Sequence, residues 1–268
     1  MKYGICLGIN NYSWLSPSAS LRGCVRDARE WAELFADFYG FDEIHLLTDA
    51  AATPSGLQSA ISRVAERAVA GDLVAVTYSG HGTQVPDADG DEPDGYDEAI
   101  VLHGQVYTDD AIHGDLSVFG PDIRVVLVSD SCHSGTLTRG LPAEMLPGPD
   151  KAHPMIPRTA AVGDLWRPGA QGCPGRRLHH RFGAPRGAAD ASRILLAGCK
   201  ASETSMDAWL AREYHGALTY HAVRLLQEDQ RMSWREFGGL LGACVARTSP
   251  QTPQLEGAPA ALDSGVFA

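Results

Sequence analysis

The chain has 268 residues, of which 44% are hydrophobic and 21% are charged, and its formal net charge at pH 7 is −11. This length and composition predict a globular protein with a sizeable core, and the acidic balance argues against nucleic-acid binding. No apolar run reaches the ~18 residues that a membrane span needs, and the N-terminal segment is too short and too glycine-rich for a signal peptide. Six scattered cysteines form no CxxC pair, which predicts a reduced, cytoplasmic protein.

In chain order, the sequence predicts strands that alternate with helices. The expected strands are 3–10, 43–49, 72–78, a short strand or hairpin over 99–107, 123–128, 193–199 and 251–256. The expected helices are 21–39, one capped by Thr53, one beginning at Asp109 after Thr108, 217–228, and one from Ser233 to about Arg247 with Glu236 completing a capping box. The stretch 86–98 is expected to be an acidic loop. This alternation predicts a mostly parallel sheet covered on both faces.

Residues 138–190 differ in composition from the rest of the chain. They hold eight of the 16 prolines, eight glycines and seven arginines, and they show no sustained periodicity. We expect a mobile linker or surface excursion there, between a large part, 1–137, and a small part, 191–268, that complete one sheet.

Two of the expected strands end in residues that could act together as a nucleophile and its base. The strand 123–128 is followed by DSCHSG, which includes Cys132, and the strand 72–78 by SGHG, which includes His81. Chemistry in open α/β sheets lies at the carboxyl edge of the strands, so we expect a thiol and an imidazole to meet there. Taken alone, a cysteine is more often a buried small hydrophobe than a nucleophile.

The two motifs, YSGHG at 78–82 and DSCHSG at 130–135, resemble those of the metacaspases among the caspase-like cysteine peptidases. The cysteine motif is not the QAC-x-G form of animal caspases, which favours the metacaspase branch. Further matches cover nearly the whole chain outside 138–190: GCVRDA at 23–28, GYDE at 95–98, AGCK at 197–200 with Glu203-Thr204, GALT at 216–219, and QTPQ at 251–254. The resemblance implies a caspase-like three-layer α/β/α sandwich with a mostly parallel six-stranded sheet, and the activity of a cysteine endopeptidase.

The resemblance also implies roles for single residues. Cys132 as thiolate would attack the scissile carbonyl while His81 manages the proton of the leaving amine. The backbone N–H groups of Gly82 and Cys132 are expected to form the oxyanion hole.

Four side chains are expected at the same sheet edge, where they would suit a cationic substrate residue, arginine or lysine. They are Asp27, Asp130, Cys24 and Ser79. The matching positions in metacaspases line the S1 pocket. The alternative for Asp27 is that an acid in the first turn of a helix only complements the helix dipole.

No cofactor is required for this chemistry, but the resemblance raises calcium as an activator. Asp97, Asp109 and Asp110 match positions that bind calcium in many metacaspases, and hard cations need several oxygen ligands. The alternative is a solvated acidic surface. Where those relatives carry a further Asp after the catalytic cysteine, this chain has Thr138, Arg139 and Gly140.

The arginine-rich segment 138–190 could be cut when the protease is activated. Locally it carries a net +4, from eight basic and four acidic residues, and a proline- and glycine-rich segment is easily threaded into a protease cleft. The preferred cut region contains Arg176, Arg177, Arg181 and Arg186, with the cut made in cis or by a separate activating protease.

Three functions are compared. The leading one is a cytosolic, monomeric endopeptidase that acts on protein substrates with exposed arginine or lysine. The others are a thiol hydrolase with a different preference at the residue before the cut, and a catalytically silent caspase-like scaffold that binds partners.

Overall fold

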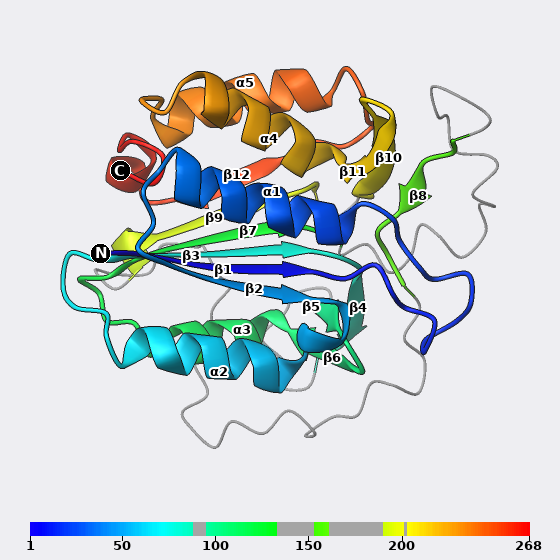
Figure 1. Ribbon diagram of the computed structural model, residues 1–268, viewed down its shortest axis with the longest axis horizontal. Coiled ribbons are helices and arrows are strands. Elements are labelled where there is room, and N and C mark those ends of the chain that lie inside the picture. The colour runs from blue at the N-terminus through cyan, green and yellow to red at the C-terminus, as the bar shows by residue number, and fades with distance from the viewer. Residues whose placement is uncertain (88–94, 133–152, 161–189, 201–202) are drawn as a thin grey trace.

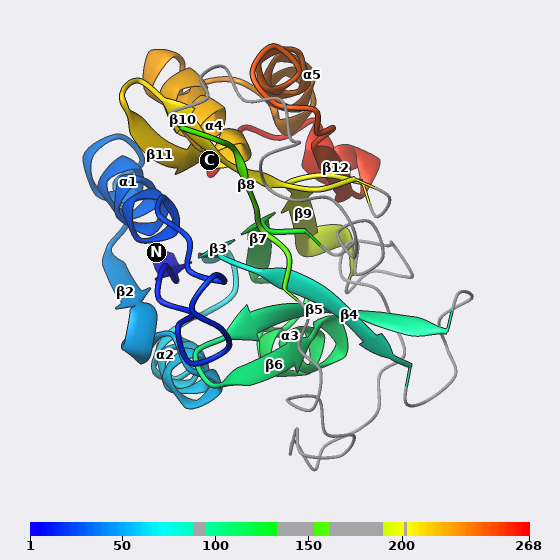
Figure 2. The ribbon, with the colours of Figure 1, turned by 90° about the vertical axis from the view of Figure 1, so that its right-hand side faces the viewer.

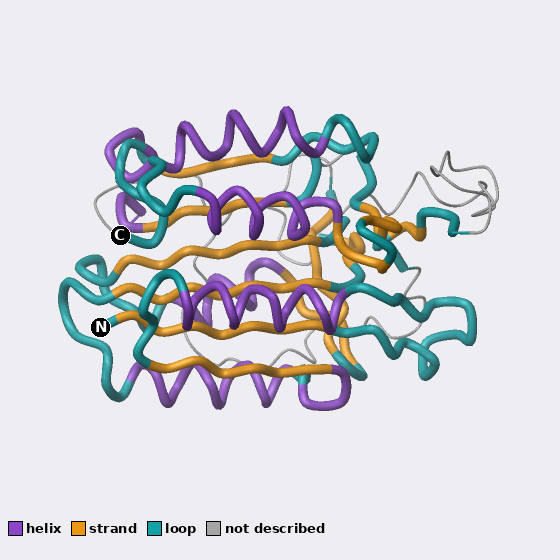
Figure 3. The backbone as a smooth tube through the Cα atoms, turned by 45° about the horizontal axis from the view of Figure 1, so that its top comes forward, coloured by secondary structure: helices purple, strands orange, loops and turns teal. Residues whose placement is uncertain are grey.

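The computed structural model describes residues 1–87, 95–132, 153–160, 190–200 and 203–268. Its centre is a six-stranded sheet in the order β12-β9-β7-β3-β1-β2, in which all neighbours are parallel except β12 with β9. Figures 1 and 3 show these strands side by side. Their bounds are β1 Lys2–Gly8, β2 Glu43–Thr48, β3 Leu73–Ser79, β7 Arg124–Asp130, β9 Arg193–Ala197 and β12 Gln254–Gly257. β3 and β7 are almost wholly buried, as their unbroken apolar runs predict.

Helices cover both faces of the sheet (Figure 1). On one face lie α1 (Cys24–Asp37), α4 (Ala217–Glu228), α5 (Trp234–Val245) and α6 (Pro259–Leu262), and on the other lie α2 (Pro54–Ala65) and α3 (Asp109–Leu116). Side-chain caps fix the starts of three of them: Thr53 and Thr108 accept from the backbone of α2 and α3, and Ser233 with Glu236 forms the expected capping box of α5. Each face therefore has its own hydrophobic core.

Two small three-stranded sheets lie at the carboxyl end of the parallel strands. One joins β4 (Gly82–Pro86), β5 (Tyr96–Leu102) and β6 (Gln105–Thr108); the other joins β11 (Glu213–Gly216), β10 (Met206–Leu210) and β8 (Ile156–Pro157). Seen from that end, β8 crosses the edge of the main sheet between β10 and β4 (Figure 2). Short 3-10 turns at Asp49–Ala51 and Asp190–Ser192 complete the described elements.

The sandwich and its six-stranded sheet agree with the sequence-based expectation, and two local expectations are wrong. Residues 82–86 and 96–98 of the expected turn and acidic loop belong to strands, because β4 and β5 pair with each other. Residues 153–160 of the expected surface excursion are packed against β10 and the ends of β3 and β7. No helix in the described part of the chain is long and apolar enough to span a membrane.

Candidate functional site

A buried arginine, Arg158, occupies an acidic pocket at the carboxyl end of the sheet. Its exposed fraction is 0%. Nη2 donates to Asp27 Oδ2 at 2.6 Å and to Asp207 Oδ1 at 3.0 Å. Nη1 donates to Ser79 Oγ at 2.7 Å and to the carbonyl oxygen of Asp130 at 3.0 Å, and it lies 3.3 Å from Asp130 Oδ2. Three carboxylates and a hydroxyl therefore surround one guanidinium.

The protein holds the pocket carboxylates in place independently of the arginine. Asp130 accepts from Ser205 Oγ at 2.7 Å and from both the backbone N and the Oγ1 of Thr219 at 2.9 Å. Asp207 accepts from the backbone N of Arg22 at 2.8 Å. These bonds come from three different elements or loops, so the acceptors are fixed before any cation enters.

Gly216 and Cys24 complete the walls of the pocket. The Gly216 backbone N donates to Asp27 Oδ2 at 3.0 Å, and a Cβ at this position would overlap Asp130 Oδ2 and the Arg158 guanidinium. Glycine is therefore required here to leave room for the cation. Burial raises the pKa of the Cys24 thiol, with the guanidinium acting in the opposite direction, so Cys24 is a thiol at neutral pH.

The charge of the pocket depends on its occupant. Burial raises the pKa of Asp27, but the charge of Arg158, the neighbouring His215 side chain and a hydrogen bond from Ser79 outweigh it and hold the pKa below its usual value. For Asp207, burial outweighs Arg158 and the pKa is raised. The guanidinium of Arg158 therefore favours the ionised form of both Asp27 and Asp207.

The backbone of Arg158 is held as closely as its side chain. Its carbonyl oxygen accepts from Gly82 N at 2.9 Å and Cys132 N at 3.3 Å, and its own N donates to Ser205 O at 2.9 Å. Ala160 N donates to Gly82 O at 3.2 Å. A Cβ on Gly82 would overlap the carbonyl group of Cys132, so only glycine permits this approach. Two N–H groups that converge on one carbonyl oxygen form the arrangement that stabilises an oxyanion.

The Cys132 side chain is buried beside a second thiol. Its Sγ donates to the Glu203 carbonyl oxygen at 3.1 Å, and Cys199 Sγ lies 3.5 Å from the same oxygen. The hydrogen bond to Cys132 and burial both raise the pKa of the Cys199 thiol. Cys199 therefore keeps its proton, which it can donate to the sulfur of Cys132.

His81 has a fixed tautomer. Its Nε2 lies 2.6 Å from the carbonyl oxygen of Ala19, and because a carbonyl oxygen only accepts, Nε2 carries the proton and Nδ1 keeps its lone pair. Nδ1 has no hydrogen-bond partner among the described residues. Burial lowers the pKa of His81 to about 4; the bond to Ala19 opposes this and the guanidinium of Arg158 adds to it. The imidazole is therefore neutral at pH 7.

Tyr12 holds the imidazole in position. The two ring centroids are 4.4 Å apart, and the Tyr12 hydroxyl accepts from the His81 backbone N at 2.9 Å. The same hydroxyl donates to Val101 O at 3.0 Å and lies 3.1 Å from Tyr78 Oη. The histidine is thus held by a buried hydrogen-bond network that joins two loops, at Tyr12 and His81, to the strands β3 and β5.

The structure brings Cys132, Gly82 and the four expected pocket residues around one segment, 153–160, and places His81 at the same edge. The sequence analysis missed Asp207, and it counted Arg158 only as one of several arginines in the linker. The preferred cut region, Arg176 to Arg186, lies outside the described residues.

The expected calcium ligands lie at the starts of β5 and α3. Burial, together with the charges of Asp110, Glu98 and Asp97, raises the pKa of Asp109 to about 8. These carboxylates are therefore close enough to repel one another, and oxygen donors suit calcium. Within the described ranges, however, no group of three Asp, Glu, His or Cys side chains is arranged to hold a metal ion, and calcium binding stays a prediction.

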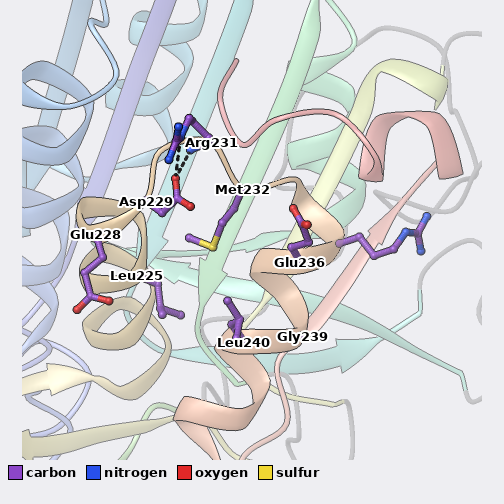
Figure 4. A pocket seen from close by; sticks show the side chains of 9 residues that line it. Leu225, Glu228, Asp229, Arg231, Met232, Glu236, Gly239 and Leu240 are labelled. Carbon is purple, nitrogen blue, oxygen red and sulfur yellow. Dashed lines mark hydrogen bonds and ion pairs between the residues drawn. The ribbon is translucent and has the colours of Figure 1, made fainter.

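A separate hollow of about 850 Å³ lies between α4 and α5 (Figure 4). It is lined by Leu225, Glu228, Asp229, Arg231, Met232, Arg235, Glu236, Gly239 and Leu240. No expected site residue is among them, and its rim carries a surface ion pair between Arg231 and Asp229 at 3.5 Å. The acidic pocket itself is not a cavity, because the guanidinium of Arg158 fills it. The acidic pocket is therefore identified by Arg158, the residue that fills it.

Comparison with known proteins identifies a family for the chain. Residues 2–140 match the family described as metacaspase, peptidase C14 domain. Metacaspase-1 of Cryptococcus neoformans is 30% identical over an alignment that covers 95% of this chain and 62% of that protein. Metacaspase-1 of Pyricularia oryzae is 28% identical, with 94% of this chain and 70% of that protein covered. The chain thus spans less than two thirds of the length of the first relative.

A solved structure supports the fold over the whole chain. The crystal structure of a Geobacter sulfurreducens protein matches with a TM-score of 0.73 at 27% identity, and the match covers 100% of this chain and 98% of that one. Together with the family match over residues 2–140, these comparisons show that the chain belongs to the metacaspases, in peptidase family C14.

Proposed function

We propose that this chain is a cysteine endopeptidase that cleaves after arginine, with Cys132 as nucleophile and His81 as proton carrier. One observation supports this most directly. Arg158 lies in the cleft as a substrate would, with its guanidinium among Asp27, Asp130 and Asp207 and its carbonyl oxygen between the N–H groups of Gly82 and Cys132.

The proposed reaction has two stages, formation of a thioester and its hydrolysis. Cys132 gives its proton to Nδ1 of His81, and its sulfur attacks the carbonyl carbon of the arginine, forming a C–S bond. The negative charge on the carbonyl oxygen is stabilised by the two N–H groups. His81 then protonates the leaving amine as the C–N bond breaks, and water later hydrolyses the thioester. Burial lowers the pKa of His81 to about 4, so the imidazole is neutral at pH 7 and its Nδ1 lone pair is available to accept a proton.

The pocket favours arginine over lysine. Two guanidinium nitrogens contact four acceptors within 3.0 Å, on four different residues. A lysine ammonium is a point charge that cannot span these acceptors in the same way. We therefore expect lysine substrates to be cleaved more slowly than arginine substrates.

The bond between Arg158 and Thr159 is the first one that the proposed enzyme would cut, in cis. While the segment is bound it competes with other substrates, so the uncut chain is expected to be less active. Protein substrates with exposed arginine in extended segments would follow once the cleft is open. This proposal replaces Arg176 to Arg186 as the preferred cut region.

The test is incubation of purified wild type beside Cys132→Ala. We expect wild type to give fragments of about 17 and 12 kDa, in proportion to 28.6 kDa over 268 residues, with a new N-terminus at Thr159, while Cys132→Ala stays intact. An arginine chloromethylketone should label wild type at Cys132. A folded wild type that is neither cut nor labelled, under any divalent-ion condition, would indicate the silent scaffold instead.

A further inference from the structure

We propose that β10 selects substrates at three positions at once, and that the preferred sequence before the cut is that of residues 153–158. This inference rests on the proposed function, and it extends recognition beyond the arginine pocket. In the bound segment, Met155 is the fourth residue before the Arg158–Thr159 bond and His153 is the sixth. The class of substrate is an extended segment with a large apolar residue at the fourth position and a flat, aromatic-like residue at the sixth.

The backbone sets the register of the bound segment. β8 pairs antiparallel with β10, with Ile156 opposite Asp207 and Pro157 opposite Met206. Arg158 N donates to the Ser205 carbonyl oxygen, and ladder bonds of an antiparallel pair recur at every second residue. Pro157, between Ile156 and Arg158, therefore does not have to donate a backbone N–H to β10. This is why a proline fits there without the loss of a hydrogen bond.

One face of β10 forms an apolar site for the fourth position. Met155 is 4% exposed although it comes from a loop, and it is packed against Met206, Ala208 and, at the edge, Leu210. These three residues alternate along β10 and so share one face. The small side chain of Ala208 leaves the space that the methionine fills. A charged residue at this position would be buried without a partner.

The opposite face of β10 reaches the other two positions. Asp207 contacts the Arg158 guanidinium, and Trp209, two residues on, stacks on the His153 ring at 3.9 Å between centroids and 9° between planes. Tyr214 braces this indole edge-on at 5.1 Å and donates its hydroxyl to Pro154 O at 3.2 Å. The aromatic surface is therefore held in place by the β10–β11 hairpin.

The test compares synthetic substrates on wild-type protein. The hexapeptide His-Pro-Met-Ile-Pro-Arg and the dipeptide Pro-Arg, each with a fluorogenic amide, report kcat/KM. We expect the hexapeptide to exceed the dipeptide by at least 10-fold, as burial of a methionine side chain implies. Aspartate in place of the methionine should remove this gain. Alanine in place of the first histidine should reduce kcat/KM about 3-fold, as an aromatic pair implies.

Two variants separate the subsites from general damage. Trp209→Ala should erase the difference between the histidine and alanine hexapeptides, whereas Leu240→Ala, at a 50% exposed leucine on α5, should preserve it. Equal cleavage of all arginine peptides would overturn this inference while leaving the proposed function intact. Cleavage of none of them would instead refute the proposed function, because the dipeptide needs only the arginine pocket.

Discussion

Asp27→Asn should release Arg158 to an external protease. The change is made in Cys132→Ala, which removes self-cleavage, and it deletes a charge whose Oδ2 lies 2.6 Å from Arg158 Nη2. At that distance the attraction of the two charges is about 6 kcal/mol at an effective dielectric of 20, and removal of one partner of a buried charge pair typically costs about 2–5 kcal/mol. The population with the segment undocked should therefore rise about 30- to 4,000-fold.

Trypsin measures that population, because Arg158 is 0% exposed while docked and cleavage follows the open fraction when closing is fast. The rate of cutting after Arg158 is followed by mass spectrometry. Asp207→Asn should have a smaller effect, since burial already raises the pKa of Asp207. Asp263→Asn, at a 62% exposed surface pair, is the control. If Asp27→Asn and Asp263→Asn are cut after Arg158 at the same rate, the electrostatic account of the pocket is wrong.

Three further predictions concern activity, pH and metal. Asp27→Ala and Asp130→Ala should each lower kcat/KM on arginine peptides by a factor equivalent to about 2–5 kcal/mol; unchanged values in both would remove the proposed pocket. His81 has a folded pKa of about 4 and an ordinary value of 6.5, so the unfolded chain binds more protons between these values. Wild type should therefore lose stability as pH falls from 7 to 4. In denaturant titrations the free energy of unfolding of His81→Gln should fall by about 3 kcal/mol less than that of wild type over this range. Millimolar calcium should raise the melting temperature, and Asp110→Ala should abolish the rise; an identical wild-type melting curve in EGTA would exclude the site.

The sequence predicted the sheet edge well because its signals there are local. The buried runs that end at Ser79 and Asp130 are continuous and apolar, and each is followed by a small polar turn. The caps Thr53 and Ser233 act within three residues of themselves. Local chemistry of this kind needs no knowledge of distant partners.

The β10–β11 hairpin could not be predicted in the same way. Its two-residue turn is Ala211 and Arg212, with φ of 50° and 73°, where such turns usually carry Asn or Gly. The sequence therefore lacks the usual signal of a hairpin turn. Without that signal, the sequence gives no reason to place Asp207 on a strand. Arg158 was one of seven arginines in its segment, and only its contacts with three remote carboxylates distinguish it.

The position of β9 has a thermodynamic consequence for a chain cut after Arg158. β9 pairs along β7, and Leu196 and Phe237 share a core with Phe35 and Val126, so the two pieces would stay together as one folded body. Once denatured, however, they would have to find each other in solution. Refolding would then be a bimolecular reaction, and the stability of the cut protein would depend on its concentration, whereas the intact chain refolds alone.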